Sequence, residues 1–328
     1  MPPSTQSEQL APPPLPLLPV TQQPPTSSPP PVELIVKLGG SALTNKQKRA
    51  TLDAPRFEAS IQLMSTLYHA GVGFILVHGA GSFGHMEATH YQIRNGKATP
   101  LAMSATHAAV TQLNSTIVTA LIQRGVPAVG VSPLLVPTRV RNEFVATLLD
   151  RAHIPVLHGD ICYGADGRTA ILSGDTLVST LCAAFDCVRR VVFLCDVPGL
   201  LSRPPSQSQP AHLVRRVLVN ERGDVKLDTE IQTTQAAHDV SGGIMAKLMA
   251  AAKSVAQGGG RVTAFIAGVS SEGAQQALLW RPERGMTSSC TRISYEIAGG
   301  GGGNEPESSA SMPRRRGWFR AARDDALR

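Results

Sequence analysis

The sequence has 328 residues, enough for one large α/β domain or two smaller ones. Hydrophobic residues make up 42% of the chain and aromatic residues only 4%, so a core has to be built from Ala, Val, Ile and Leu, and stacking platforms for nucleic-acid bases are too few. The formal net charge of +7 suits an anionic ligand, either a small phosphate or a nucleic acid, without choosing between them.

The cysteines do not indicate a disulfide scaffold or a zinc site, because both need paired spacings and the chain has no C-x-x-C. No run approaches 18 uninterrupted apolar residues, so no membrane span is expected. No basic residue precedes Lys37 and prolines interrupt Leu10–Val20, which argues against a mitochondrial presequence and a signal peptide. We therefore expect a cytoplasmic protein without metal ligands, with free thiols at Cys162, Cys182, Cys187, Cys195 and Cys290.

The chain begins with a proline-rich segment. Residues 1–31 contain twelve prolines, and proline fixes φ and lacks an amide donor, so a disordered tail is expected there. Residues 298–328 form a second expected tail, rich in Gly at its start and in Arg further on. A docking ligand in the first tail and a binding role for the basic patch Arg314–Arg316 in the second are the alternatives that the sequence leaves open.

Between the tails, short β-branched runs alternate with longer Ala- and Leu-rich stretches. The runs predict strands at Val32–Leu38, Gly73–His78, Ala128–Val131, Pro155–His158, Arg190–Leu194 and Val262–Ala267. The longer stretches predict helices at Pro55–Ala70, Ser104–Arg124, Asp175–Ala184 and Ile244–Gln257. This alternation predicts a single αβα three-layer sandwich with a mostly parallel central sheet at 32–297, and such sheets bind ligands beyond the carboxyl ends of their strands.

Residues 202–234 break the alternation. They hold Pro204-Pro205, several Ser and Gln, the run Leu213–Val219 and a Glu-Arg-Gly-Asp turn, which together predict an insertion carrying a β-hairpin.

The first glycine loop, Lys37–Ser41, directly follows the first predicted strand. Its two glycines let backbone amides approach a phosphate, and Lys37 can reach the same phosphate with its ammonium group. A Gly-Gly turn beside a surface lysine accounts for the same residues equally well.

The second loop, His78–His85, formally matches the dinucleotide fingerprint G-x-G-x-x-G. A dinucleotide site needs an acidic residue about 20 positions further on, and no Asp or Glu occurs between Glu87 and Glu143, so only a variant that uses Arg94 stays open. The Walker sequence G-x-x-x-x-G-K-[ST] is absent from the chain.

Three further segments can bind phosphate. Ser173–Asp175 opens a predicted helix, where Asp175 is either a cap or a catalytic group. Asp196–Leu200 follows a predicted strand, and Asp239–Lys247 holds another Gly-Gly pair at a helix start. Several anion-binding loops in one sheet indicate two phosphorylated ligands that face each other.

These segments together resemble the amino acid kinase superfamily and, within it, the isopentenyl phosphate kinase family of eukaryotic type, from Val32 to Ile293. The motifs that carry the resemblance are Lys37–Lys46, Gly79–His85 and Ser241–Lys247, and the branch is indicated by Arg203-Pro204-Pro205 and Ala236–Asp239. The family usually has a Gly-Thr pair before its last strand, where this chain reads Gly285-Met286-Thr287.

The resemblance implies transfer of the γ-phosphoryl group of ATP, with Mg²⁺, to isopentenyl phosphate or a similar alkyl phosphate, by a homodimer. The acceptor half would be 32–185 and the ATP half 186–297. The implied catalytic residues are Lys37, Lys46, His85, Asp175 and Lys247. The implied ATP-binding residues are Lys37, Leu38, Gly39, Gly40, Ser41, Gly81, Asp196, Gly199, Gly243 and Lys247. The implied acceptor-binding residues are Ala80, Gly84, His85 and Gly159, with Ala80 and Gly159 supplying amides.

In this interpretation Lys37 bridges the transferred group and the acceptor, Lys46 stabilises transition-state charge, Lys247 holds the ATP phosphates, and Asp175 orients the lysines. A phosphate acceptor is already deprotonated near neutral pH, so His85 would donate a hydrogen bond and would not act as a base. An apolar slot for the alkyl tail is expected from the helix at 104–124 and the strands near Val129 and Val156.

Three other functions remain open from the sequence. A kinase of the same superfamily could use a carboxylate, a nucleoside monophosphate or a phosphonate, although the His85 loop argues against the first two. A noncatalytic nucleotide sensor would not need Lys37, Lys46, Asp175 and Lys247 together. A nucleic-acid binder would be confined to the arginine-rich tail, and no nucleic-acid partner is expected for the folded part.

Overall fold

The computed structural model describes residues 32–93, 98–134, 138–164, 167–203, 211–227, 242–281 and 289–296. The two expected tails lie outside these residues, as do Arg94, Pro204-Pro205, Ala236–Asp239 and Gly285-Met286-Thr287. None of the helices in the described part has the length and hydropathy of a bilayer-spanning segment.

The centre of the fold is a mostly parallel sheet, which confirms the predicted class. Within the described residues it holds nine strands, in the order β3 (Ala128–Val131), β4 (Ile154–His158), β2 (Gly73–His78), β1 (Val32–Leu38), β7 (Arg190–Cys195), β10 (Thr263–Gly268), β11 (Thr291–Tyr295), β8 (Arg216–Val219) and β9 (Val225–Leu227). The pairs from β3 to β10 are parallel, β11 runs antiparallel to β10, and β8 and β9 form an antiparallel hairpin at the sheet edge.

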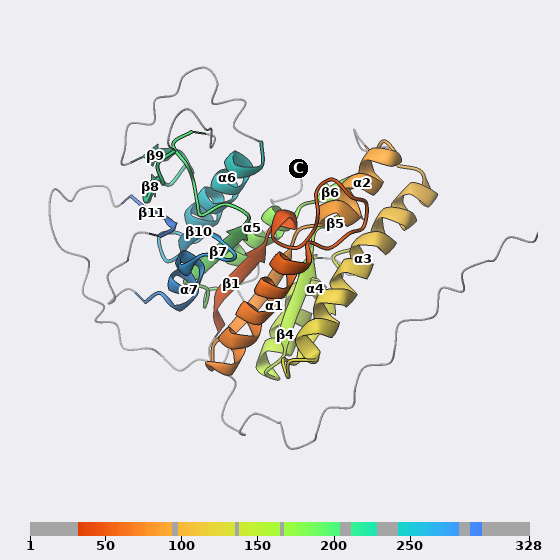
Figure 1. Ribbon diagram of the computed structural model, residues 1–328, viewed down its shortest axis with the longest axis horizontal. Coiled ribbons are helices and arrows are strands. Elements are labelled where there is room, and N and C mark those ends of the chain that lie inside the picture. Colours follow the sequence, from red (N-terminus) through yellow and green to blue (C-terminus); the bar gives the residue numbers. More distant parts are fainter. Residues whose placement is uncertain are drawn as a thin grey trace, which may run out of the picture.

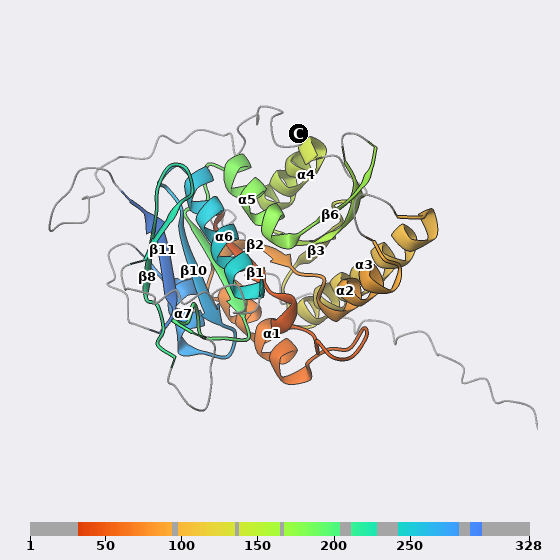
Figure 2. The same cartoon turned by 90° about the horizontal axis from the view of Figure 1, so that it is seen from above.

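Helices cover both faces of this sheet (Figures 1 and 2). One face packs against α1 (Ala54–His69), α3 (Pro100–Ile122) and α7 (Glu272–Leu279), and the other against α4 (Thr138–Asp150), α5 (Gly174–Ala184) and α6 (Gly242–Gln257). Alternate residues of β1 divide between the two cores: Leu34 and Val36 join the first, and Ile35 joins the second. This alternation is the period of two expected of a strand buried on both sides.

Every strand and helix named in the sequence analysis is present, with ends that coincide or differ by a few residues. The helix starts follow ordinary capping chemistry. The Asp53 side chain accepts from the Arg56 amide, Thr99 from Ala102 and Ser173 from Thr176. The predicted hairpin within 202–234 is the β8–β9 pair, which turns through residues 220–224.

Three helices, one hairpin, the strand β11 and the short 3₁₀ turn Gly40–Ala42 were not placed from the sequence. The interpretation of His78–His85 as a loop is wrong for its second half, because Gly81–His85 begins α2 (Gly81–His90). Gly81 has a φ of +52°, which lets the chain turn directly from β2 into that helix. The other unpredicted elements include α4, α7 and the separate hairpin of β5 (Asp160–Tyr163) and β6 (Thr169–Leu172).

Candidate active site

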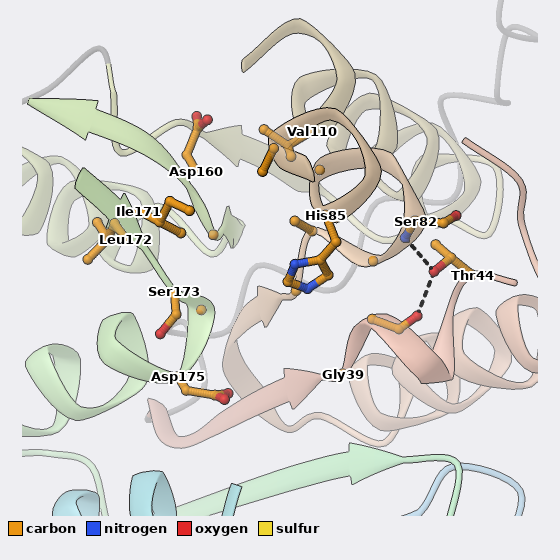
Figure 3. A pocket seen from close by; sticks show the side chains of 18 of the residues that line it. Gly39, Thr44, Ser82, His85, Val110, Asp160, Ile171, Leu172, Ser173 and Asp175 are labelled. Carbon is orange, nitrogen blue, oxygen red and sulfur yellow. Dashed lines mark hydrogen bonds between the residues drawn. The ribbon is translucent and has the colours of Figure 1, made fainter. Parts of the chain in front are cut away.

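A cavity of about 490 Å³ lies beyond the carboxyl ends of β1, β2 and β4, where the sheet topology predicts a ligand. Its wall is formed by residues of the first glycine loop, the start of α2, the helix α3, the β4–β5 junction, the start of α5 and the helix α6. Figure 3 shows part of this wall. Of the residues implied by the resemblance, it is lined by Lys37, Gly39, Gly40, Ser41, Lys46, Ala80, Gly81, Gly84, His85, Gly159, Asp175 and Lys247. Segments that are far apart in the sequence therefore share one cavity.

Lys37 stands near the end of the central strand β1 and is almost fully buried, with 5% of its surface exposed. Its Nζ lies 2.7 Å from Oδ1 of Asp175, at the start of α5. A Cβ on Gly174 would lie 2.7 Å from the Cε of Lys37, so only glycine leaves room for the lysine stem there. The ammonium is therefore fixed at the cavity floor by a carboxylate that orients it.

The two glycine loops touch backbone to backbone. A Cβ on Gly40 would lie 2.6 Å from the Cα of Gly81, a contact that any other residue would prevent. This approach places the short 3₁₀ turn Gly40–Ala42 beside the N-terminus of α2. The N-termini of α2 and α5 both line the cavity, and the unpaired amides and partial positive charge of helix starts favour anions.

Lys46 lies on an exposed hairpin at the cavity rim, with 67% of its side chain exposed. Its Nζ lies 2.9 Å from Oδ2 of Asp196, and the Ser41 hydroxyl donates to Oδ1 of the same aspartate at 2.7 Å. Burial raises the pKa of Asp196, but the hydrogen bonds from Lys46 and Ser41 together outweigh it and leave the pKa below its usual value. The Asp196 carboxylate is therefore charged and orients Lys46.

Lys247 reaches the cavity from α6. Its Cε lies 3.5 Å from the position that a Cβ of Gly39 would occupy, so its stem passes over the first glycine loop. Lys37, Lys46 and Lys247 thus bring three cations to one cavity from three separate segments of the chain.

His85 projects from α2 into the cavity (Figure 3). The open cavity keeps the ring accessible to solvent, although protein surrounds it on its other sides. Desolvation by that surrounding protein, and secondarily the charge of Lys37, lower the pKa of His85 below its usual 6.5. At neutral pH the imidazole is therefore neutral, with one N–H to donate.

Four implied residues do not line the cavity. Leu38 is fully buried in the core, and Asp196 is linked to the cavity through two residues that line it, Lys46 and Ser41. Gly199 packs against β11, where a Cβ would lie 2.6 Å from Oγ1 of Thr291. Gly243 lies in the first turn of α6, and the cavity wall on that helix begins at Ala246.

The expected amide donor at Gly159 needs correction. Gly159 does line the cavity, but its N–H donates to the carbonyl of His78 at 3.1 Å, which leaves that amide engaged. His78 itself is buried and stacks on His158, with ring centroids 5.6 Å apart. Burial lowers the pKa of His78 to about 3, so this histidine is a neutral part of the core.

The far end of the cavity is apolar. Helix α3 contributes Val110 to this end, as expected. The expected contribution from Val129 and Val156 is wrong, because neither valine lines the cavity and Val156 is fully buried in the core. The apolar wall comes from the end of α2 and the β5–β6 hairpin, and includes Met86, Ala88, Ile93, Ile161, Ile171 and Leu172. Two strands of four residues each, with no alternating pattern, gave no sequence signal for this wall.

Thr44 and Ser82 are polar wall residues that the sequence analysis did not select. The Thr44 hydroxyl donates to the Gly40 carbonyl at 2.9 Å and accepts from the Ser82 amide at 3.0 Å (Figure 3). They join the first glycine loop to α2. Both residues lie in motifs that carried the family resemblance. The sequence signal that could have identified them is their position near Gly40 and Gly81, the glycines through which the two loops make contact.

Comparisons with known proteins agree with this geometry. A model of the amino acid kinase family matches residues 33–268, and the chain belongs to that family. The isopentenyl phosphate kinase of Arabidopsis thaliana is 36% identical over 200 residues, which cover 55% of this chain and 60% of that protein. The isopentenyl phosphate kinase of Thermoplasma acidophilum is 27% identical over 215 residues, covering 64% of this chain and 82% of that protein.

Solved structures share the fold. The product complex of T. acidophilum isopentenyl phosphate kinase aligns with a TM-score of 0.61 and 21% identity, covering 79% of this chain and 99% of that one. Carbamate kinase from Giardia lamblia bound to AMP-PNP aligns with a TM-score of 0.55 and 16% identity, covering 81% of this chain and 99% of that one. Kinases with chemically different acceptors therefore share the architecture, and the acceptor has to be inferred from the site.

Proposed function

We propose that this chain is an isopentenyl phosphate kinase, which transfers the γ-phosphoryl group of ATP to the phosphate of isopentenyl phosphate. The observation that carries the proposal is the composition of one cavity. Cations and helix N-termini surround one end, aliphatic side chains form the other, and His85 stands where the two meet. A short alkyl phosphate matches both ends, because its phosphate fits the cationic end and its alkyl group fits the apolar wall. An amino acid or carbamate acceptor has no alkyl group of this kind to place against the apolar wall.

In the proposed reaction, the acceptor phosphate attacks the γ-phosphorus of ATP, and the bond from that phosphorus to the bridging oxygen breaks to release ADP. Both reactants are anions, so the main task of the protein is to place them in line and neutralise their charge. Lys37, held by Asp175, lies on the cavity floor where the two phosphates would meet. Lys247 would hold the β- and γ-phosphates, and Lys46 would reach the developing charge from the rim.

The acceptor phosphate needs no general base, because its second pKa is about 6 and it is deprotonated at neutral pH. A neutral His85 then serves as a hydrogen-bond donor that holds the acceptor. The start of α2, including Ala80, Gly81 and Gly84, supplies the helix-terminal environment that favours the same phosphate.

Mg²⁺ would enter as part of the MgATP substrate and neutralise phosphate charge. Asp175 and Asp196, the carboxylates nearest the expected phosphates, are engaged by Lys37 and by Lys46 with Ser41. The triphosphate itself is therefore the expected main ligand of the metal. We also propose a homodimer in the cytoplasm, on the family resemblance alone, with light scattering of the purified chain as the check on its mass.

The test is an acceptor panel with the purified full-length chain and MgATP. The panel contains isopentenyl phosphate, uridine monophosphate, N-acetylglutamate, carbamate and a small alkyl phosphonate, with products identified by ³¹P NMR. A diphosphate product from isopentenyl phosphate is expected, with kcat/KM at least about 100-fold above the carboxylate acceptors. Preferred turnover of any other acceptor would contradict the proposal.

A further inference from the structure

The rim lysine is carried by a hairpin that has few supports of its own. Residues Thr44–Leu52, here called the Lys46 hairpin, are closed by a bridge between Thr44 and Leu52 and by a hydrogen bond from the Asn45 amide to the Thr51 carbonyl. From Lys46 to Ala50 every side chain is exposed. Asp196 holds the Lys46 ammonium, but the exposed backbone that carries the lysine also has to be fixed by another part of the fold.

Helix α2 supplies that support at two levels. Near the base of the hairpin, Ser82 donates its amide to Thr44 Oγ1 at 3.0 Å and exchanges hydrogen bonds with the backbone of Thr51 at 3.3 and 3.4 Å. Near the tip, Nε of Arg49 lies 2.6 Å from Oε1 of Glu87. The hairpin therefore rests on the same helix that presents His85 to the cavity.

Helix geometry explains why α2 presents His85 and Glu87 on different sides. Glu87 lies two residues after His85, and successive residues turn by about 100°, so the two side chains project from nearly opposite faces. His85 faces the cavity, whereas Glu87 faces the Lys46 hairpin. One rigid helix thus sets the position of the acceptor-binding histidine and of the hairpin at once.

We propose that Arg49 and Glu87 are positioning residues that fix the Lys46 hairpin on α2, so that the Lys46 ammonium and His85 keep a set separation across the phosphate to be transferred. This inference rests on the proposed function. It assigns to the pair a role in the transfer step, in contrast to a role in binding ATP.

The asymmetric burial of the pair supports this role. The Glu87 side chain is only 4% exposed, whereas that of Arg49 is 70% exposed. A buried carboxylate is costly to leave unpaired, so Glu87 holds the guanidinium more tightly than an ordinary surface carboxylate would. The pair also lies away from the cavity wall, because neither residue lines it.

The kinetic test uses Arg49→Ala, which removes an exposed side chain and leaves the buried Glu87 carboxylate without this partner. We expect kcat to fall about tenfold, as for a catalytic group displaced by a fraction of an ångström to an ångström, with the KM for ATP changed by less than about twofold. Arg49→Lys should restore part of the loss, because it keeps the charge but not the guanidinium geometry. The matched control is Glu58→Gln, which removes the exposed pair between Glu58 and Arg124 and should leave kcat unchanged.

A double variant separates positioning from general damage. If the pair acts through Lys46, Arg49→Ala should change kcat by less than about twofold when it is added to Lys46→Ala. A further tenfold loss in that background would overturn the inference, as would unchanged kcat in Arg49→Ala alone.

Hydrogen exchange tests the same inference without any substrate. Peptides that cover residues 45–51 should take up deuterium faster in Arg49→Ala and in Glu87→Gln than in the wild type, while peptides from α7 should not change. Equal uptake in the hairpin would overturn the proposed clamp. Failure of the wild type to phosphorylate any acceptor would instead contradict the proposed function, and the exchange result would still decide whether the clamp exists.

Discussion

Two lysine–aspartate pairs serve the same cavity and differ in the burial of the lysine and in the elements that carry them. Lys37 and Asp175 meet at the sheet floor with side-chain exposures of 6% and 26%, and both stand on regular elements. Lys46 and Asp196 meet at the rim with exposures of 67% and 23%, and both stand on loops. One cation is fixed by the core, and the other depends on a hairpin.

This difference indicates how the site divides its work. A charge in a partly desolvated position acts strongly on nearby phosphates, because little water screens it. A charge at the rim acts more weakly, because water and salt screen it. The buried pair is therefore expected to contribute the larger share of transition-state stabilisation, and the rim pair a smaller share.

The largest effect is expected from Lys37→Met, which keeps the apolar stem and removes the charge. We expect kcat to fall by about 100- to 1,000-fold, the range measured when one preorganised electrostatic group is removed from an active site. Steady-state kinetics with isopentenyl phosphate and MgATP measures it. Asp175→Asn is the companion variant. It keeps the lysine but loosens its orientation, so its loss should be smaller, and a larger loss would assign Asp175 a direct part in the reaction.

A smaller effect is expected from Lys46→Ala at the rim. Loss of a partly screened cation should lower kcat by about 10- to 100-fold and change the KM for ATP by less than about threefold. Raising the salt concentration should reduce wild-type kcat towards that of the variant, because exposed charges are screened. Wild-type kcat with weakened ATP binding would place Lys46 in ground-state binding and would remove the functional contrast between the two pairs.

The sequence predicted the members of these pairs better than the pairs themselves. Lys37, Asp175 and His85 were selected through the family resemblance, and each stands beside a glycine at a strand end or helix start, where the topology of such sheets places ligands. The pairing of Lys46 with Asp196 joins positions 150 residues apart, and the sequence assigned Asp196 to ATP, because local pattern does not encode which loops meet in space. The engaged amide of Gly159 was missed for the same reason: its acceptor is a carbonyl on another strand.

The fold shows the same division between local and tertiary information. Buried parallel strands such as β1 and β2 are largely apolar runs and were located to the residue. The β5–β6 hairpin has strands of only four residues, and some of its apolar side chains, such as Ile171, are exposed beside the cavity. Its role in the apolar wall became evident only from the tertiary structure.

Acid should destabilise the buried histidine region before it affects the Lys46–Asp196 pair. The pKa of His78 lies at about 3 in the folded chain against an ordinary value of 6.5, and burial also lowers the pKa of His158. The unfolded chain therefore binds these protons first, so the free energy of unfolding should fall as pH drops below about 6.5, by up to ~1.4 kcal/mol per pH unit for each histidine. For His78 this fall continues towards pH 3. The pKa of Asp196 is lowered, so its contribution is lost only at more acid pH.

Urea unfolding at pH 7, 6 and 5 measures this slope. His78→Gln is the matched variant, because glutamine takes up no proton in the unfolded chain, and its slope should be shallower than that of the wild type. The buried Asp160 opposes the trend at the acid end, since burial raises its pKa above 3.8, and it is present in both proteins. Parallel slopes in the two proteins would show that His78 takes up its proton without loss of the fold.

The smallest effect is a titration shift that distinguishes the two lysines directly. Burial is the larger cause of the low pKa of His85, and the charge of Lys37 is the second. In Lys37→Met the pKa of His85 should therefore rise but stay below 6.5, whereas Lys46→Ala should leave it unchanged, because the rim ammonium is directed to Asp196. NMR titration of the imidazole, assigned with His85→Gln, measures both shifts. An equal change in the pKa of His85 in the two variants would show that the buried and the exposed lysine act equally on this histidine. The proposed contrast between Lys37 at the cavity floor and Lys46 at the rim would then be wrong.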